Sequence, residues 1–242
     1  MAFAIQWHCQ QGTRTADNRD HAGVGIRGDS ILAIVLDGSS SGPASGLFAR
    51  EIAQRLVDWF VTTTADITAP TITEQLRLTH EALAGDFRRD SASYVLFCAD
   101  AARRAIALHA GDCLLGHRDG EGQISWLIQP HTLANALSAI PHAILAKLDA
   151  RHGLTRSFRS KNFVAPDLTL VDLQDQVLFI GTDGFWADMD PDVQNAFAEG
   201  RFPANEAKHD DRGLLSISRT ATGAVTEISG THATASIYVR RA

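Results

Sequence analysis

Short apolar runs rich in β-branched residues recur along the chain, and polar turns join most of them in neighbouring pairs. Runs of this length and composition are typical of β-strands. They predict strands over Val24–Ile26, Ile31–Leu36, Ser93–Cys98, Ala105–Ala110, Cys113–His117, Gln123–Ile128, Leu168–Leu173, Gln176–Ile180, Leu214–Ser218 and Ala233–Val239. Strands that follow one another across a short turn pair as hairpins, so this grouping favours antiparallel sheets.

Other segments place their apolar residues at helical spacing. They predict helices over Ser45–Thr62, Thr73–Gly85, Leu133–Leu148 and Pro191–Ala198. Pro70 opens the second of these helices, and Pro141 interrupts the third. Because the strands come in hairpin-like groups and not in regular β-α-β alternation, the order of elements indicates the α+β class.

Length and composition are those of an ordinary soluble globular protein. The 242 residues suffice for a proper core, and we expect a single domain over residues 1–242. The chain is 45% hydrophobic and 21% charged. Its net charge of −6, without any basic stretch, argues against nucleic acid as a partner.

The sequence also predicts where the protein works. It has no apolar run long enough to cross a membrane, and its start does not resemble a signal peptide. Cys9, Cys98 and Cys113 are odd in number and lack C-x-x-C spacing, which agrees with a reducing compartment. We therefore expect a cytoplasmic protein without a membrane partner.

Two Asp-Gly pairs follow apolar strand-like runs: ILAIVLDG ends at Asp37-Gly38, and QVLFIGTDG ends at Asp183-Gly184. A carboxylate at the end of a buried strand is held rigidly, and the glycine lets backbone approach a ligand. Asp-Gly is also common turn chemistry, so either pair alone is compatible with a simple turn. Two such pairs far apart in sequence suggest one centre built from two strands, which we interpret as a divalent metal site.

Further motifs stand in order around these pairs: Asn18-Arg19-Asp20, VLDGSSSG, the GDC of Gly111–Cys113, IQPHTL, LTRSF and TDGFW. In this order and spacing they resemble the metal-dependent protein phosphatase family, the type 2C serine/threonine phosphatases, and especially its bacterial members. The resemblance covers about residues 11 to 240. It implies a four-layer α/β/β/α sandwich of two antiparallel sheets flanked by helices.

The resemblance also implies an activity and residues that perform it. The activity is hydrolysis of phosphoserine and phosphothreonine by a hydroxide that bridges two divalent ions, Mn²⁺ or Mg²⁺. Asp37 would bridge both ions, the Gly38 carbonyl would bind one of them, and Asp183 would bind the other. Asp20 would act directly or through a water, and Arg14 would hold the substrate phosphate in fork geometry.

The chain departs from the family pattern near the expected metal centre. Arg19 stands where the family has Glu or Gln, so its guanidinium either points away or weakens the binding of one ion. The late acidic motif is ambiguous, because Asp210-Asp211 precedes one strand while Thr231-His232 lies in another. We favour Asp210 as the late metal ligand. Asp112 is interpreted as a structural turn residue.

Three functions therefore remain in view. The first is a metal-dependent serine/threonine phosphatase with a phosphorylated protein as substrate and a cognate Ser/Thr kinase as partner, expected to be a monomer. The second is a catalytically impaired pseudophosphatase that binds phosphoproteins, which Arg19 and the ambiguous late motif keep open. The third is a small-molecule phosphatase on the same scaffold. The serines at 39–41 do not indicate a serine hydrolase, since no G-x-S-x-G motif surrounds them.

Overall fold

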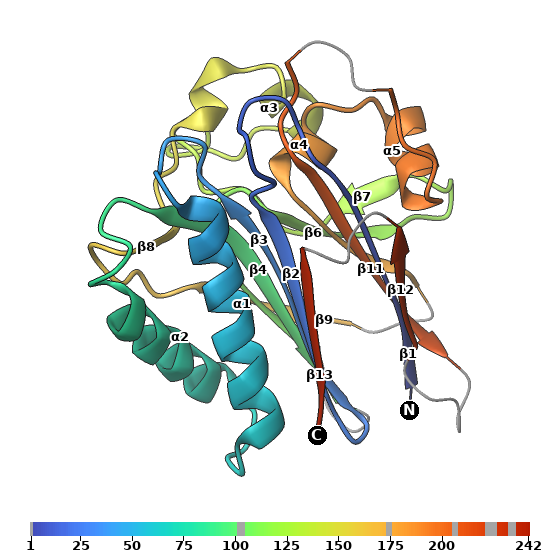
Figure 1. The fold of residues 1–242 in the computed structure, drawn as a ribbon. Helices are drawn as coiled ribbons and strands as arrows, with labels where there is room; N and C mark the ends of the chain where they lie inside the picture. The colour runs from blue at the N-terminus through green and yellow to red at the C-terminus, as the bar shows by residue number, and fades with distance from the viewer. Residues whose placement is uncertain (1, 101–104, 173–175, 205–207, 221–226, 232–235) are drawn as a thin grey trace.

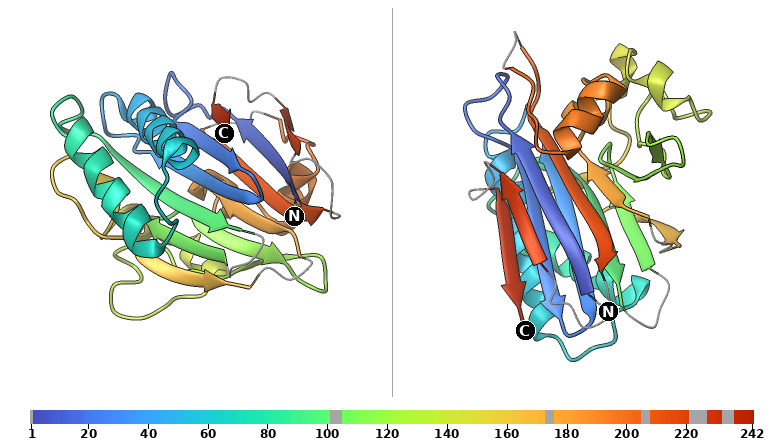
Figure 2. Two further views of the ribbon diagram at one scale, coloured as in Figure 1. Left: turned by 90° about the horizontal axis from the view of Figure 1, so that it is seen from below. Right: turned by 90° about the vertical axis from the view of Figure 1, so that its right-hand side faces the viewer.

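The structure, a computed structural model, describes residues 2–100, 105–172, 176–204, 208–220, 227–231 and 236–242. Two β-sheets lie face to face, and helices flank them on their outer sides (Figures 1 and 2). The predicted α+β sandwich is thereby confirmed. Among the described residues, no helix is long and apolar enough to cross a membrane.

Both sheets are mostly antiparallel, with one parallel pair each. Sheet I consists, in spatial order, of β12 (Glu227–Thr231), β1 (Ala2–Gln10), β11 (Arg212–Thr220), β10 (Leu178–Gly181), β6 (Leu114–Arg118) and β7 (Ile124–Trp126). Sheet II consists of β13 (Ile237–Arg241), β2 (Asp20–Arg27), β3 (Ser30–Gly38), β4 (Ser91–Ala99), β5 (Ala105–Ala110) and β9 (Asp167–Val171), and β8 (Phe158–Arg159) pairs with β4. The parallel pairs are β12 with β1 and β13 with β2, so each sheet is mixed.

The two helical layers differ in size. The long helices α1 (Ser45–Thr62) and α2 (Ala69–Leu83) cover sheet II (Figure 1). On the side of sheet I the helices are short: α3 (His142–Leu145), the 3₁₀ turn η1 (Asp149–His152), α4 (Asp183–Trp186) and α5 (Pro191–Ala198). α5 packs through Phe197, whose ring lies edge-on to His8 of β1.

Side chains of β3 explain why an uninterrupted apolar run makes a central strand. Ala33 and Val35 pack into the core between the sheets, while Leu32 and Ile34 pack against α1 and α2. Both faces of the strand are therefore buried, and each face needs apolar residues. The result is a strand held firmly from Ser30 to Gly38, which fixes the position of Asp37 near its end.

The predicted helix over Leu133–Leu148 is wrong. The structure has turns and bends there, with only the four-residue α3 inside this range and η1 directly after it. Pro141 blocks a continuous helix, and much of the expected apolar face is not buried: Leu133, Leu137 and Ile144 are 62%, 101% and 55% exposed, while Leu145 enters the core. Helical spacing without burial does not stabilise a helix.

Most other predicted elements are found with shifted ends. The helix predicted over Thr73–Gly85 begins earlier, at Ala69, because Thr68 caps its first turn by accepting a hydrogen bond from the Thr71 amide. β1 was not predicted from the sequence. The prediction over Ala233–Val239 corresponds to β13, but residues 232–235 lie outside the described residues, as do 173–175 between the predicted Leu168–Leu173 and Gln176–Ile180.

Candidate functional site

Strand ends from both sheets meet at one end of the sandwich, at the top in Figure 1, around a cleft of about 300 Å³. Four carboxylates and one guanidinium line it: Asp37, Asp112, Asp183, Asp210 and Arg14. Every acidic residue predicted from the sequence to bind metal, with the exception of the fully buried Asp20, thus opens on the same cleft. The structure brings together residues that are up to 196 positions apart.

Sheet II supplies one half of this group. Asp20, at the start of β2, pairs in register with Asp37 near the end of β3, and Asp37 pairs in turn with Ser93 of β4. The Ser93 hydroxyl donates a hydrogen bond of 2.6 Å to Asp112 Oδ1. Antiparallel pairing therefore sets three carboxylates along one end of the sheet.

Sheet I supplies the other half. Asp183 begins α4 directly after β10, and Asp210 lies just before β11, which pairs antiparallel with β10. The Thr182 hydroxyl joins the two halves by donating to Asp20 Oδ2 at 2.7 Å. A side chain at position 184 would overlap the carbonyl oxygen of Asp211, so Gly184 permits the close approach of α4 to this loop.

Negative charge is concentrated in the cleft. Burial, followed by the charges of Asp211 and Asp183, raises the pKa of Asp20 well above its usual range. Burial, followed by Asp183 and Asp20, does the same to the pKa of Asp37. Burial and Asp183 raise the pKa of Asp112 to about 7. Closely spaced buried carboxylates resist ionising together unless a cation joins them.

Asp20 provides a direct test of whether a metal ion fits. Its Oδ1 is buried and has no hydrogen-bond partner among the described residues. An unpartnered buried carboxylate oxygen is unfavourable, and a cation would satisfy it. The converging donors are all oxygens, which is the set that Mg²⁺ and Mn²⁺ prefer. The chemistry of these residues therefore suits a divalent ion.

Arginines of the chain itself hold two of these carboxylates. The Arg14 guanidinium donates to Asp210 Oδ2 at 2.5 Å, and Arg151 donates to Asp183 Oδ2 at 2.8 Å. As the side chains stand, no three His, Cys, Asp or Glu residues within the described part of the chain are grouped closely enough to hold a metal ion. Metal binding would thus require these ion pairs to adjust.

The two late acidic residues have different surroundings. Asp210 lines the cleft beside Arg14, whereas Asp211 is buried and accepts hydrogen bonds from the Gly12 and Arg19 amides at 2.7 and 2.8 Å. Asp211 therefore ties the loop before β2 to the start of β11. Of the other predicted alternative, Thr231-His232, His232 lies outside the described residues.

Arg19 points away from the cleft carboxylates. Its Nη1 donates to the backbone carbonyls of Ser39 and Gly42 at 2.6 and 2.8 Å. Of the two alternatives that the sequence left for Arg19, the guanidinium thus points away from the expected metal centre. The serine loop that Arg19 holds, residues 39–41, lines the cleft. Gly38 starts this loop, and a side chain there would overlap the Ser45 backbone.

Two residues of the sequence motifs, His131 and Arg156, do not line the cleft. His131 stacks on His109 and hydrogen-bonds Asp167, and Arg156 pairs with the same carboxylate.

Sequence reasoning missed Arg151, because nothing in its local pattern shows that it is buried. It also took Asp112 for a turn residue, whereas Asp112 lines the cleft.

Comparisons with known proteins agree with this fold. No protein-family model matches the chain, and no curated protein matches it. Solved structures do match: Stp1, a serine/threonine phosphatase from Staphylococcus aureus, has a TM-score of 0.77 at 14% identity, covering 91% of this chain and 96% of that one. The serine/threonine phosphatase PstP/Ppp from Mycobacterium tuberculosis has a TM-score of 0.71 at 15% identity, covering 91% and 100%.

A second structure of PstP, its catalytic domain in complex with two manganese ions, matches with a TM-score of 0.66 at 14% identity, covering 89% of this chain and 97% of that one. At such identities the likeness concerns the fold. The expectation drawn from the motifs is confirmed at that level: this chain has the fold of the bacterial type 2C serine/threonine phosphatases.

Proposed function

We propose that the protein is a metal-dependent serine/threonine phosphatase that removes phosphate from phosphoserine or phosphothreonine in proteins. The observation that carries this proposal is the convergence of Asp37, Asp183 and Asp210 at one strand-end cleft beside Arg14, with the buried Asp20 paired in register with Asp37. A cluster of buried carboxylates without enough cations is unfavourable for stability, and binding of divalent ions would make it favourable.

Two divalent ions, Mn²⁺ or Mg²⁺, are the proposed cofactors. Asp20, Asp37, Asp183, Asp210 and the carbonyl of Gly38 would hold them. Such ions supply two things to phosphate hydrolysis, a lowered pKa for water and neutralisation of the phosphate charge. The unpartnered Oδ1 of Asp20 and the raised pKa values of Asp20 and Asp37 support this assignment.

Residues of the chain would bind and orient the substrate. Arg14 lies at the cleft with its side chain 37% exposed, and its guanidinium can offer two parallel hydrogen bonds to a phosphate. An incoming phosphate would compete with Asp210 for Arg14, and Asp210 would then be released toward the metal ions. The serine loop, fixed by Arg19, forms the facing wall of the cleft.

The test is release of inorganic phosphate from a phosphothreonine peptide in the presence of Mn²⁺. We expect turnover that excess EDTA abolishes and added Mn²⁺ restores. Asp37→Asn should lower kcat/KM by about a thousandfold or more, since positioned cations that stabilise developing charge supply much of the rate in such reactions. Asp66→Asn, at the opposite end of the α1/α2 layer, is the matched control and should retain wild-type turnover. Full activity in EDTA, or in Asp37→Asn, would contradict the proposal.

A pseudophosphatase is the second candidate, and one observation favours it: Arg14 and Arg151 hold carboxylates that an active metal centre needs. Such a protein would bind the phosphothreonine peptide in the presence of Mn²⁺ without releasing phosphate. The position of Asp210 counts against it, because Asp210 lines the same cleft as Asp183 and its charge contributes to raising the pKa of Asp183. Fluorescence anisotropy of the labelled peptide, run beside the phosphate assay, separates the two functions.

A further inference from the structure

Arg151 is a buried cation inside the cluster of carboxylates. It belongs to η1 and is only 5% exposed. Its Nη1 donates to Asp183 Oδ2 and its Nη2 to Asp188 Oδ1, each at 2.8 Å. Arginine is rarely buried unless it is paired, and two hydrogen bonds to charged groups hold its fork in one orientation.

The two halves of the cleft therefore differ in charge balance. Asp183 has a guanidinium against one of its oxygens. Asp20 and Asp37 have no salt bridge to an arginine, lysine or histidine among the described residues, and Asp20 Oδ1 has no partner at all there. A divalent ion near Asp20 and Asp37 would meet carboxylates that no described arginine holds, whereas one near Asp183 would have to compete with Arg151.

We propose that Arg151 competes with a divalent ion for Asp183, so that the chain binds one ion tightly beside Asp20 and Asp37 and a second one weakly beside Asp183. The inference rests on the proposed function, because it takes Asp183 as a metal ligand. The second ion binds only when the guanidinium leaves Asp183 Oδ2. Arg151 acts through Asp183 and is a positioning residue.

Arg151 is close in sequence to residues that form the cleft wall. His152 directly follows Arg151, Leu154 comes three residues after it, and both line the cleft. Release of Arg151 from Asp183 would therefore move or loosen this part of the wall. Occupancy of the weak metal position and the shape of the cleft are coupled through one short turn.

Manganese binding tests this inference without any need for turnover. EDTA-treated protein is titrated with Mn²⁺, and free Mn²⁺ is followed by electron paramagnetic resonance. We expect two classes of site in the wild type. In Arg151→Met the weak class should tighten on the order of 10- to 100-fold, a change as large as the loss seen when a supporting partner of a metal ligand is removed but opposite in sign, while the tight class stays unchanged.

Two further variants serve as controls for Arg151→Met. Arg156→Met removes an arginine that pairs with Asp167 away from the cleft, so it should leave both constants unchanged. Arg151→Lys keeps a positive charge but cannot bridge Asp183 and Asp188, so the weak class should tighten less than in Arg151→Met. This variant also carries the test if Arg151→Met does not fold, which its melting temperature reveals.

Several results would overturn the inference. Two equal sites in the wild type would do so, and so would unchanged constants in a folded Arg151→Met protein. These results are distinguishable from failure of the proposed function. If the two Mn²⁺ sites are unequal and the weak one tightens in Arg151→Met, but no phosphopeptide is hydrolysed, the inference is supported and the proposed function is rejected. If phosphopeptide is hydrolysed with Mn²⁺ but the Mn²⁺ dissociation constants are the same in wild type and Arg151→Met, the function is supported and the inference is rejected.

Discussion

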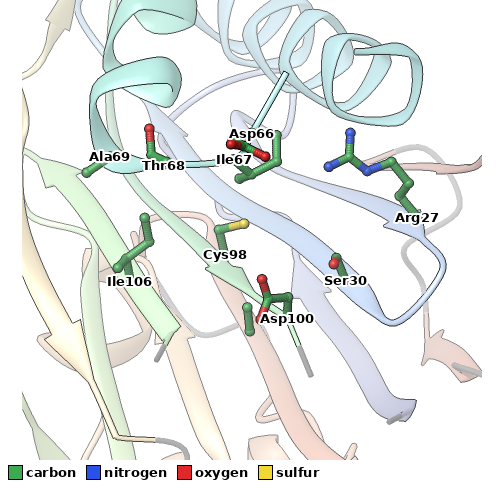
Figure 3. A pocket seen from close by; sticks show the side chains of 10 residues that line it. Arg27, Ser30, Asp66, Ile67, Thr68, Ala69, Cys98, Asp100 and Ile106 are labelled. Atoms are coloured by element: carbon green, nitrogen blue, oxygen red, sulfur yellow. The ribbon is translucent and has the colours of Figure 1, made fainter. Parts of the chain in front are cut away.

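Cavities of nearly equal size lie at the two ends of the layer that α1 and α2 form with sheet II. The carboxylate-lined cleft measures about 300 Å³. The other cavity, which we call the far cavity, measures about 330 Å³ and is lined by Arg27, Ser30, Asp66, Ile67, Thr68, Ala69, Cys98, Ala99, Asp100 and Ile106 (Figure 3). β3 connects them, with Ser30 at the far cavity and Asp37 at the cleft.

Their chemistry is different. The far cavity mixes apolar residues and Cys98 with two carboxylates, Asp66 and Asp100. Its arginine is already engaged: Arg27 donates to the Thr63 carbonyl at 2.7 Å and lies over the Phe60 ring. Thr68 is the cap of α2. At the cleft, carboxylates converge and repel one another. Burial and mutual repulsion of the carboxylates, and not cavity volume, therefore distinguish the cleft as the candidate site.

The largest effect on stability should come from adding a side chain where α4 packs closely against the loop before β11. Gly184→Ala would place a methyl group on the Asp211 carbonyl oxygen, which we expect to cost about 2–3 kcal/mol and to lower Tm by ~8 °C. Gly85→Ala, where the added methyl meets no atom within 4 Å, is the control and should leave Tm within ~1 °C. Differential scanning calorimetry measures both. Equal losses in the two variants would show that the cleft is not specially packed.

The pH dependence of stability should separate the charged cleft from the rest of the molecule. Burial and Asp183 raise the pKa of Asp112 to about 7, above its value in the unfolded chain. A raised pKa in the folded state means that its contribution to stability is present below about pH 4 and is lost as pH rises through about 7. Metal-free protein should therefore lose ~5 °C in Tm between pH 5 and 8. Saturating Mn²⁺ should reverse the loss, and Asp112→Asn should flatten the metal-free profile.

Neutralising one carboxylate of the cleft should stabilise the metal-free protein, whereas neutralising one carboxylate of the far cavity should not. Asp37 has no hydrogen-bond or ion-pair partner among the described residues, and its neighbours are carboxylates. Asp37→Asn should raise the Tm of EDTA-treated protein at pH 7.5 by ~3 °C, while Asp66→Asn should leave it unchanged. A lower Tm for Asp37→Asn would show that the carboxylates do not repel one another as proposed.

The smallest effect should come from Arg19, which shapes the cleft without facing the carboxylates. Arg19→Met removes the hydrogen bonds to Ser39 and Gly42 that hold the serine loop. We expect KM for the phosphopeptide to rise roughly three- to tenfold with little change in Mn²⁺ affinity. A large change in Mn²⁺ affinity, with KM unaffected, would instead place Arg19 at the metal centre.

Local pattern was enough to predict the parts of the cleft that lie at strand ends. The run ILAIVLDG predicted a buried strand ending in a rigid carboxylate, and QVLFIGTDG predicted the same for Asp183; both carboxylates line one cleft. The helix over Ser45–Thr62 was predicted with the bounds that α1 has, because its apolar face is long and regular. Strong local signals and burial agree at these positions.

Residues whose role depends on distant contacts were not predictable in this way. Arg151 stands in a polar stretch, and only its bonds to Asp183 and Asp188 make it a buried cation. The apolar spacing from Leu133 to Leu148 suggested a helix, but Leu133, Leu137 and Ile144 are exposed, and only part of the expected apolar face, including Leu145, reaches the core. Non-local packing decides both cases, and a single sequence does not display it.

The most direct test of the central claim is anomalous scattering from crystals of the protein grown with Mn²⁺, with data collected at the manganese edge. We expect a strong anomalous peak, marking a manganese ion, beside Asp20 and Asp37, a weaker peak beside Asp183, and none in the far cavity. A cleft without any anomalous peak at saturating Mn²⁺, in crystals of the folded wild type, would contradict the account.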